Sequence, residues 1–240
     1  MIASSKEYEV MKSEKYPRHS SMIDLDDVIL LLIDHQSGLL QLVKDLEIEE
    51  LRTNIVMLAK LAKLMKIPVI ATASVPDGPN GPLIPEIKEN LPEAIYVPRH
   101  GQVNAWDNAD FVKEVELSNK KTLVMAGTLS NVCLAFPAIC AANDGYKVYA
   151  LMDASGCYSK FSKDIVLARM VHAGVIPTDT LALMAEIQQT WARPEANDFA
   201  ELYCYRMPNY RLLMESHERA SIAAKSGPKD PKQASKLKNL

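Results

Sequence analysis

The chain has 240 residues and a formal net charge of −3, with 48% hydrophobic and 24% charged residues. These proportions are typical of a soluble globular protein and exclude a wholly disordered or fibrous chain. The slight negative charge provides no overall positive field that would attract nucleic acid or an anionic membrane.

Targeting and redox signals are weak. The longest strongly apolar run, Val28–Ile33, is far shorter than the roughly 20 residues of a membrane span. The first residues lack the apolar core of a secretory signal, and the final Lys-Asn-Leu only faintly resembles a peroxisomal signal. The four cysteines show neither a disulfide framework nor zinc-site spacing. We therefore expect a cytoplasmic protein with free thiols and no membrane partner.

Three regions follow from composition. Residues 1–24 are polar and are expected to form an N-terminal arm, and residues 25–225 are expected to form the folded domain. Residues 226–240 are rich in Lys, Pro and Ser and are expected to be a basic, disordered tail. The tail lysines are the only feature that favours nucleic-acid binding, and we do not expect nucleic acid as a partner.

Within the folded region, strand-like and helix-like patterns alternate along the chain. Short apolar runs predict strands over 28–34, 68–74, 94–97, 122–127, 147–153 and 175–177. Helical spacing predicts helices over 46–65, 108–117, 131–143, 163–173, 180–193, 195–203 and 208–224. A turn-rich segment over 76–82 interrupts them. This alternation predicts an α/β fold with a mostly parallel six-stranded sheet and helices on both faces.

Three chemically reactive side chains lie at the ends of predicted strands. Asp34 ends the first strand in LLLIDHQSGLL, Arg99 follows the third in AIYVPRHG, and Cys133 follows the fourth in LVMAGTLSNVCLAF. Ligands of such sheets bind at the carboxyl ends of the strands, near the point where the strand order reverses. We therefore expect these three side chains to face one crevice.

Each residue alone has an ordinary structural explanation: a turn carboxylate, a solvated arginine and a packed cysteine. Cys140, seven residues after Cys133, is expected to be core. Together, however, the three fit nucleophilic catalysis. A helix N-terminus and the Arg99 cation would lower the pKa of the Cys133 thiol. Asp34 would accept its proton, and N–H groups of the loop over 127–133 would stabilise an oxyanion.

Five segments together resemble the isochorismatase-like cysteine hydrolase superfamily, most closely its YcaC-like branch. The matching segments are IDHQSGLL at 33–40, GPNGPLIPE at 78–86, YVPRHGQVNAWDNADFVK at 96–113, AGTLSNVCLAFPA at 126–138 and DASG at 153–156. They extend over most of the folded region. The resemblance implies a Rossmann-like three-layer sandwich.

The resemblance also implies a catalytic triad of Asp, Lys and Cys. Asp34 and Cys133 match its first and third members, and Arg99 stands where the wider superfamily usually has Lys. An arginine does not give up its proton in a protein, so Arg99 is expected to act as a fixed charge and hydrogen-bond donor.

Two further expectations come from the same resemblance. It implies a cis peptide between Thr128 and Leu129, with the N–H groups of Leu129 and Cys133 aimed at the oxyanion. The metal-dependent nicotinamidases of the superfamily carry an Asp-and-His metal motif after the second strand, where this chain has SVPDGPNGP with one Asp and no His. We therefore expect no catalytic metal and no cofactor.

Four neighbouring residues complete the candidate substrate pocket. Gln36 matches the DxQ motif and is expected to orient its loop, whereas His35 is more simply a loop residue. His100, next to Arg99, is expected at the pocket rim. Trp106 is expected either to wall the pocket or to lie in a subunit contact.

The leading prediction is a metal-independent cysteine hydrolase that cleaves a small amide or related C–N bond through a thioester. One alternative is a vinyl-ether hydrolase of the isochorismatase type, against which Cys133 argues because true isochorismatases use no cysteine nucleophile. Another is a catalytically idle homo-oligomeric assembly protein. The resemblance implies a homo-oligomer, with an octamer as one candidate, and a small-molecule substrate.

Overall fold

The computed structural model describes residues 22–226, so most of the expected arm and almost all of the expected tail lie outside the described residues. The described chain contains one six-stranded sheet in which every neighbouring pair is parallel, in the order β3-β2-β1-β4-β5-β6. The strands are β1 (Val28–Ile33), β2 (Val69–Ser74), β3 (Ile95–Arg99), β4 (Thr122–Gly127), β5 (Lys147–Leu151) and β6 (Ile176–Thr178). This confirms the predicted α/β fold.

Helices of very different lengths connect and follow the strands. The α-helices are α2 (Ser37–Leu40), α3 (Ile48–Met65), α4 (Pro85–Asn90), α5 (Ala109–Leu117), α6 (Ala135–Asn143), α7 (Lys160–His172), α8 (Thr180–Gln188), α9 (Ala196–Arg206) and α10 (Pro208–Ser226). Shorter turns are η1 (Leu25–Asp27), η2 (Ala105–Asp107), η3 (Ser130–Leu134) and η4 (Met152–Ala154).

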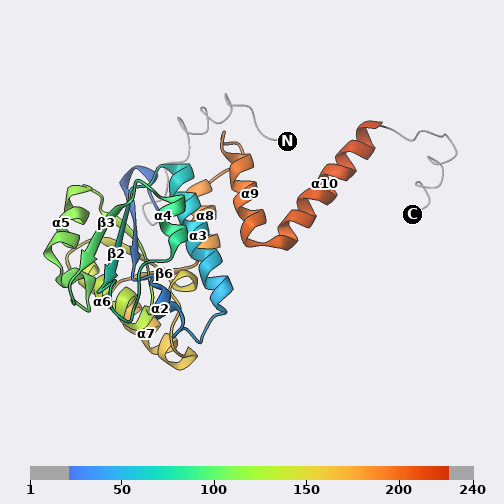
Figure 1. Ribbon diagram of the computed structural model, residues 1–240. Coiled ribbons are helices and arrows are strands. Elements are labelled where there is room, and N and C mark those ends of the chain that lie inside the picture. The colour runs from blue at the N-terminus through green and yellow to red at the C-terminus, as the bar shows by residue number, and fades with distance from the viewer. Residues whose placement is uncertain (1–21, 227–240) are drawn as a thin grey trace.

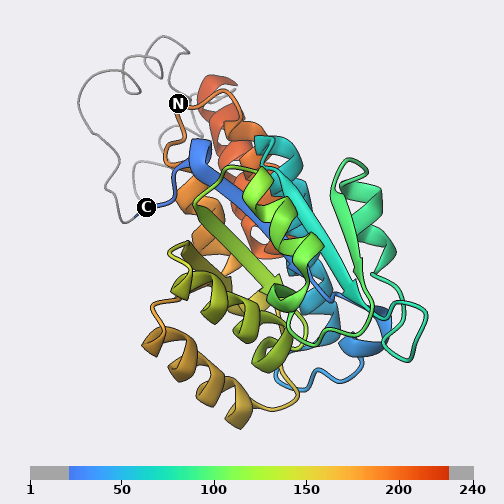
Figure 2. The ribbon, with the colours of Figure 1, turned by 90° about the vertical axis from the view of Figure 1, so that its left-hand side faces the viewer.

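The helices form a layer on each face of the sheet (Figure 1). Helices α5, α6 and α7 cover one face, which Figure 2 shows from the front, and α3, α4, α8 and α9 lie on the other. A hydrophobic core lies on each face of the sheet, and successive β1 residues point into one core and then the other. Leu30 and Leu32 pack with α3, and Leu31 and Ile33 pack with α5 and α6. All six β1 residues are buried, which explains its unbroken apolar sequence.

The strand order brings the candidate residues to one edge of the sheet. The chain adds β2 and β3 on one side of β1, then returns to add β4 on the other, so the order reverses between β1 and β4. Ile33 at the end of β1 pairs with Gly127 at the end of β4 and with Thr72 of β2. The carboxyl ends of these strands therefore meet at the switch point, where ligands of this fold class bind.

Several predicted boundaries were wrong. The structure starts the segment predicted as a helix over 131–143 with the π-helical turn η3, and α6 follows it. The short helices α2 and α4 were not predicted. The predicted helix over 180–193 ends at Gln188, because Gln189 has a positive φ of 60° and the Arg193 guanidinium donates to the carbonyl groups of Ile187 and Gln188. A side-chain donor at these last carbonyls caps a helix C-terminus.

Candidate active site

Asp34 is held firmly at the end of β1. Its backbone has a positive φ of 56°, a conformation that short polar side chains tolerate, and its N–H donates to the Thr72 carbonyl at 2.9 Å. Its Oδ1 accepts hydrogen bonds from the Ser74 N–H, at 3.0 Å, and from Arg99 Nη2. Oδ2 is also buried and makes none of these bonds within the described chain. One carboxylate oxygen is therefore anchored while the other remains available.

Arg99 is the last residue of β3 and pairs with Asp34 in the interior, with side chains 0% and 1% exposed. Its Nε donates to Thr72 Oγ1 at 3.1 Å, and its Nη1 donates to the carbonyl groups of Gln102 and Val103 at 2.7 and 3.2 Å. The guanidinium therefore faces a carboxylate, a hydroxyl and two carbonyls. It does not point into open space, so the expectation that it stabilises charge on a substrate is replaced by a role in holding Asp34.

Cys133 lies in the π-helical turn η3 and is partly exposed. Single π-helical turns occur frequently at functional sites. Burial raises the pKa of the thiol well above its ordinary value, and the charge of Asp34 and a hydrogen bond to its carboxylate raise it further. A backbone hydrogen bond from Leu129 and the charge of Arg99 oppose these effects and lower the pKa. The expected lowering of the Cys133 pKa is therefore wrong, because desolvation and Asp34 outweigh Arg99.

The loop before Cys133 contains a cis peptide between Thr128 and Leu129, as the resemblance implied. The Thr128 N–H donates to the Ile33 carbonyl at 3.1 Å, which fixes the loop against β1. The Cys133 N–H was expected to donate to the oxyanion. It instead donates to the Leu129 carbonyl at 2.9 Å, so it is already bonded within the loop. A backbone hydrogen bond from Leu129 acts on the Cys133 sulfur, and an oxyanion role for the Leu129 N–H stays a prediction.

His35 and Gln36 both lie buried behind the reactive groups. His35 Nε2 donates to the Ala154 carbonyl at 2.9 Å, and burial lowers its pKa to about 4. Gln36 bonds both backbone groups of Ser74, accepting from the N–H and donating to the carbonyl, each at 3.0 Å. Because both side chains are fully buried, they support the site and do not line a pocket.

The remaining pocket candidates lie further out. His100 is exposed beside Arg99, and its place at a pocket rim stays a prediction. Trp106 was expected either at the pocket wall or in a subunit contact. Its indole donates to Asp144 Oδ2 at 2.7 Å and packs against Tyr146. Asp144 lies at the C-terminus of α6, the end away from Cys133, which argues against the pocket wall, and the subunit contact stays a prediction.

Sequence reasoning missed Thr72 and Ser74 of β2. The Thr72 hydroxyl donates to the Val97 carbonyl at 2.7 Å and accepts from Arg99, and the Ser74 N–H donates to Asp34. The available signal was a hydroxyl residue inside the otherwise apolar strand VIATAS. A buried hydroxyl of that kind needs a partner, which pointed to a polar group on a neighbouring strand.

The described residues contain neither a metal cluster nor a membrane span. No three His, Cys, Asp or Glu side chains within 22–226 gather in a way that could hold a metal ion. Every helix in that range falls short of the length and apolarity that crossing a membrane requires.

The chain is similar in sequence and in structure to known proteins. Over 196 residues, the chain is 40% identical to the probable hydrolase YcaC of Escherichia coli K12, covering 82% of this chain and 94% of the relative. The solved E. coli structure, described as an octameric hydrolase of unknown specificity, superposes with a TM-score of 0.81 at 39% identity and covers 85% of this chain and all of that one.

A second solved relative is YcaC from Pseudomonas aeruginosa, with hexane-2,5-diol and covalent acrylamide. It has a TM-score of 0.80 at 38% identity and covers 84% of this chain and all of that one. The isochorismatase domain model matches residues 28–181, which include β1 to β6 and all three candidate catalytic residues. The chain therefore belongs to the isochorismatase family and resembles its YcaC branch.

Proposed function

We propose that the chain is a hydrolase that uses Cys133 as a nucleophile, without a metal, to cleave a C–N bond in a small amide or related substrate. The observation that carries this proposal is that the two carboxylate oxygens of Asp34 have different surroundings. Arg99 and the Ser74 N–H hold Oδ1, Oδ2 has no such partner among the described residues, and the same carboxylate lies close enough to Cys133 to raise the pKa of its thiol. The E. coli relative, described as a probable hydrolase, supports the reaction class.

In the first half of the reaction, Asp34 accepts the thiol proton as the sulfur adds to the substrate carbonyl carbon. Because the resting thiol has a raised pKa, it stays protonated until attack, and proton transfer accompanies bond formation. The Leu129 N–H donates to the developing oxyanion in this proposal. The C–N bond then breaks, the nitrogen takes the proton from Asp34, and an amine leaves a thioester on Cys133.

In the second half, Asp34 removes a proton from water as the water oxygen adds to the thioester carbon. The C–S bond breaks, the carboxylic acid product leaves, and the sulfur recovers the proton. Arg99 gives up no proton at any stage. It holds Asp34 in place through the buried ion pair, which makes it a positioning residue.

The P. aeruginosa relative carries covalent acrylamide, an amide whose carbon–carbon double bond reacts with nucleophiles. That chemistry is compatible with a reactive thiol in a site that accepts a small amide. In this chain we assign the reactive thiol to Cys133, because Cys157 and Cys204 are buried and Cys140 lies further along the same helical segment.

The test compares Cys133→Ala with Cys140→Ala in a mass-detected screen of small amides, carbamoyl compounds and nitriles. For any compound that the wild type hydrolyses, Cys133→Ala should lower turnover by at least about 10³-fold, whereas Cys140→Ala should stay within about twofold. Equal activity of the two variants would contradict the assignment.

Thiol labelling separates an active site from an idle one. Limited acrylamide at neutral pH should modify Cys133 before the other three cysteines, because Asp34 accepts the thiol proton as the sulfur attacks. Slow and uniform labelling of all four thiols would favour the catalytically idle assembly protein.

We also infer that the chain forms a homo-oligomer. The octameric assembly of the E. coli relative, which this chain matches over that relative's full length, supports this inference. Its direct test is the mass of the purified full chain in solution.

A further inference from the structure

The segments that surround Cys133 carry very little charge. Hydrogen bonds link the segment over 33–36 to those over 72–74, 99–103, 127–133 and 154–157. Within these segments, Asp34 and Arg99 are the only aspartate, glutamate, lysine or arginine residues. A charged group on a substrate at Cys133 would therefore interact mainly with these two side chains.

The Arg99 guanidinium is not available to a substrate anion. Its side chain is fully buried, and its N–H groups donate to Asp34, to Thr72 Oγ1 and to the carbonyl groups of Gln102 and Val103. A substrate carboxylate would have to displace one of these acceptors. Displacing Asp34 would leave its buried carboxylate without a partner, which is strongly unfavourable.

Asp34 makes the surroundings of the Cys133 sulfur negative. Burial is the largest cause of the raised pKa of the thiol, the charge of Asp34 is the next, and the opposing charge of Arg99 has a smaller effect. Oδ2 of Asp34 has no hydrogen-bond partner within the described chain. A carboxylate brought to the sulfur would therefore lose its water and meet a like charge that Arg99 does not fully offset.

His35 does not supply the missing positive charge. Its ring is fully buried, and its Nε2 is bonded to the Ala154 carbonyl at 2.9 Å. Burial lowers the pKa of His35 to about 4, so the ring is neutral at pH 7. A neutral imidazole gives a substrate anion no ionic partner.

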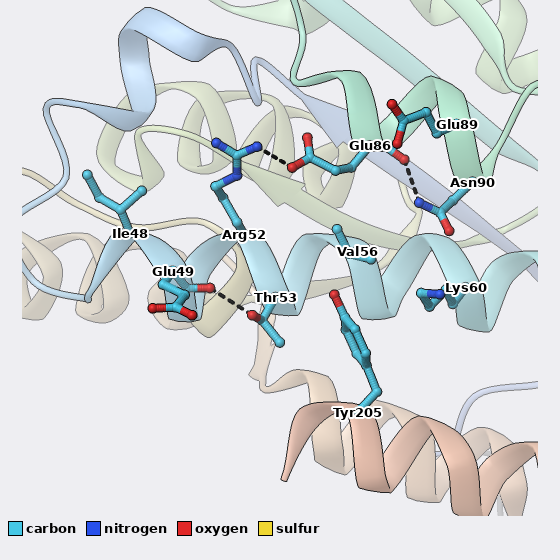
Figure 3. A pocket seen from close by; sticks show the side chains of 10 residues that line it. All are labelled: Ile48, Glu49, Arg52, Thr53, Val56, Lys60, Glu86, Glu89, Asn90 and Tyr205. Carbon is cyan, nitrogen blue, oxygen red and sulfur yellow. Dashed lines mark hydrogen bonds and ion pairs between the residues drawn. The ribbon is translucent and has the colours of Figure 1, made fainter. Parts of the chain in front are cut away.

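The groove among α3, α4 and α9 does not supply a cation to the site either (Figure 3). Its volume is about 790 Å³, and none of its lining residues belongs to the segments around Cys133. Its two cations have partners of their own: Arg52 pairs with Glu86, and the Lys60 ammonium nitrogen lies 5.2 Å from the centroid of the Tyr205 ring. An anion bound in this groove would lie outside the candidate active site.

We propose that the substrate of the candidate site is an uncharged small amide, and that the site excludes amides that carry a carboxylate, such as the half-amides of dicarboxylic acids. An uncharged amide leaves the buried Asp34–Arg99 pair intact and places no like charge beside Asp34. The inference rests on the proposed role of Cys133 as the nucleophile and narrows the class of substrate.

The test compares two alkylating reagents of similar size, neutral iodoacetamide and negatively charged iodoacetate. The full chain is labelled at pH 8, where a solvent-exposed histidine is neutral, and peptide mass spectrometry follows Cys133. The same peptide in the urea-unfolded chain gives the ratio of rates that belongs to the reagents alone. In the folded chain, the preference for iodoacetamide should exceed that ratio by at least about tenfold. Because both reagents meet the same thiol, its pKa cancels from the comparison.

A pair of variants tests the cause of this preference. Asp34→Asn removes the negative charge and keeps Arg99, so the preference for iodoacetamide should fall by at least about fivefold. Glu93→Gln makes the same change in net charge at an exposed position before the start of β3, at the opposite edge of the sheet from the site, and should keep the wild-type preference. Far-UV circular dichroism checks that each variant is folded.

The outcomes separate this inference from the proposed function. Preferential labelling of Cys133 over the other cysteines, with the reagent ratio of the unfolded chain, would overturn the inference and leave the nucleophile in place. An Asp34→Asn ratio equal to that of the wild type would overturn Asp34 as the cause of the exclusion. If Cys133 reacts with neither reagent in the folded chain, both proposals fail.

Turnover gives a second measurement. For any uncharged amide that the wild type hydrolyses, the matched half-amide with a terminal carboxylate should have a kcat/KM at least about tenfold lower. Equal values of kcat/KM for the two compounds would contradict the exclusion of carboxylates while confirming that the chain is a hydrolase.

Discussion

The side chains of Arg99 and Asp34 form an ion pair with almost no exposed surface, so neither charge has water as an alternative partner. Breaking such a pair leaves an uncompensated buried charge. We predict that Arg99→Met lowers the free energy of unfolding by about 3–5 kcal/mol at fixed protein concentration, measured by urea denaturation. The variant should also lose hydrolytic activity, because Asp34 loses its anchor.

The double variant Asp34→Asn/Arg99→Met separates charge from packing. It removes both charges, so it should recover about 1–3 kcal/mol relative to Arg99→Met. Activity should not return, because the introduced amide would not accept a proton. The single and double variants could instead be equally unstable. The lost free energy of unfolding would then come from the Arg99 hydrogen bonds to Thr72, Gln102 and Val103, and not from a buried Asp34 carboxylate without its partner.

His35 makes stability depend on pH. Burial lowers its pKa from the ordinary 6.5 to about 4, and protonating Nδ1 would place an N–H where the described chain offers no acceptor. Between pH 6.5 and pH 4 the unfolded chain therefore binds more protons than the folded one, and stability falls as the pH falls. We predict that this residue accounts for a loss of about 2 kcal/mol between pH 7 and pH 5 in urea unfolding.

His35→Gln keeps a donor toward the Ala154 carbonyl but does not titrate, so it should flatten this part of the pH dependence. His172→Gln, at an exposed position, should leave the dependence unchanged. Parallel curves for wild type and His35→Gln would show that other groups cause the effect.

At the residue scale, the sequence identified which side chains meet but not how they interact. Asp34, Arg99 and Cys133 were predicted because each stands at the end of a strand, a local property. The pKa direction of Cys133 was wrong because it depends on desolvation and on the distance to Asp34, which only the packed structure specifies. The two alternatives for Trp106 stayed open for a related reason: the path of the loop after β3 toward the far end of α6 depends on packing.

At the scale of elements, the short helix α2 lies tightly against the turn-rich segment over 76–82. The Gly38 N–H donates to the Asn80 carbonyl at 2.8 Å, and a Cβ at Gly38 would lie 2.3 Å from the Pro79 carbonyl oxygen. Real Cβ atoms do not approach backbone that closely, so the loop would have to move. We predict that Gly38→Ala lowers the free energy of unfolding by about 1–3 kcal/mol in urea.

Ser37→Ala is the matched control for this prediction. Ser37 is exposed and begins the same helix, so its replacement should change stability by less than about 0.5 kcal/mol. If Gly38→Ala is as stable as Ser37→Ala, the loop over 76–82 moves at little cost in free energy, and its contact with α2 does not stabilise the site.

Element type was predictable wherever periodicity was long, and element ends were not. The apolar run of β1 and the helical spacing of α3 left no ambiguity. The π-helical turn η3 has the same local pattern as the start of an ordinary helix, and its geometry depends on the packed loop between β4 and α6. The end of α8 depends on Arg193 returning to cap it, which is a tertiary contact.

At the scale of the whole molecule, alternation of strands and helices predicted the sheet, and the positions of Asp34 and Arg99 at strand ends predicted that their side chains meet. The direction of α10 was not predictable in the same way. Its boundaries follow from helical spacing, and Pro208 marks its start, but its path relative to α3 and α4 depends on the single corner residue Met207. The proposed homo-oligomer predicts that the stability of one chain depends on its neighbours, and the exposed Leu212 and Leu213 of α10 are candidate contacts between copies.

That coupling is testable through protein concentration. Association that favours the folded state stabilises it by mass action, so Tm rises with protein concentration. We predict that the wild-type Tm, measured by scanning calorimetry, rises over a hundredfold range of concentration, whereas that of Leu212→Glu/Leu213→Glu rises less. The Ile222→Glu control should follow the wild type, because Ile222 lies on the same face of α10 as Arg211 and Glu215. A wild-type Tm that is independent of concentration and equal to that of the double variant would mean that no stabilising contact between copies involves Leu212 and Leu213.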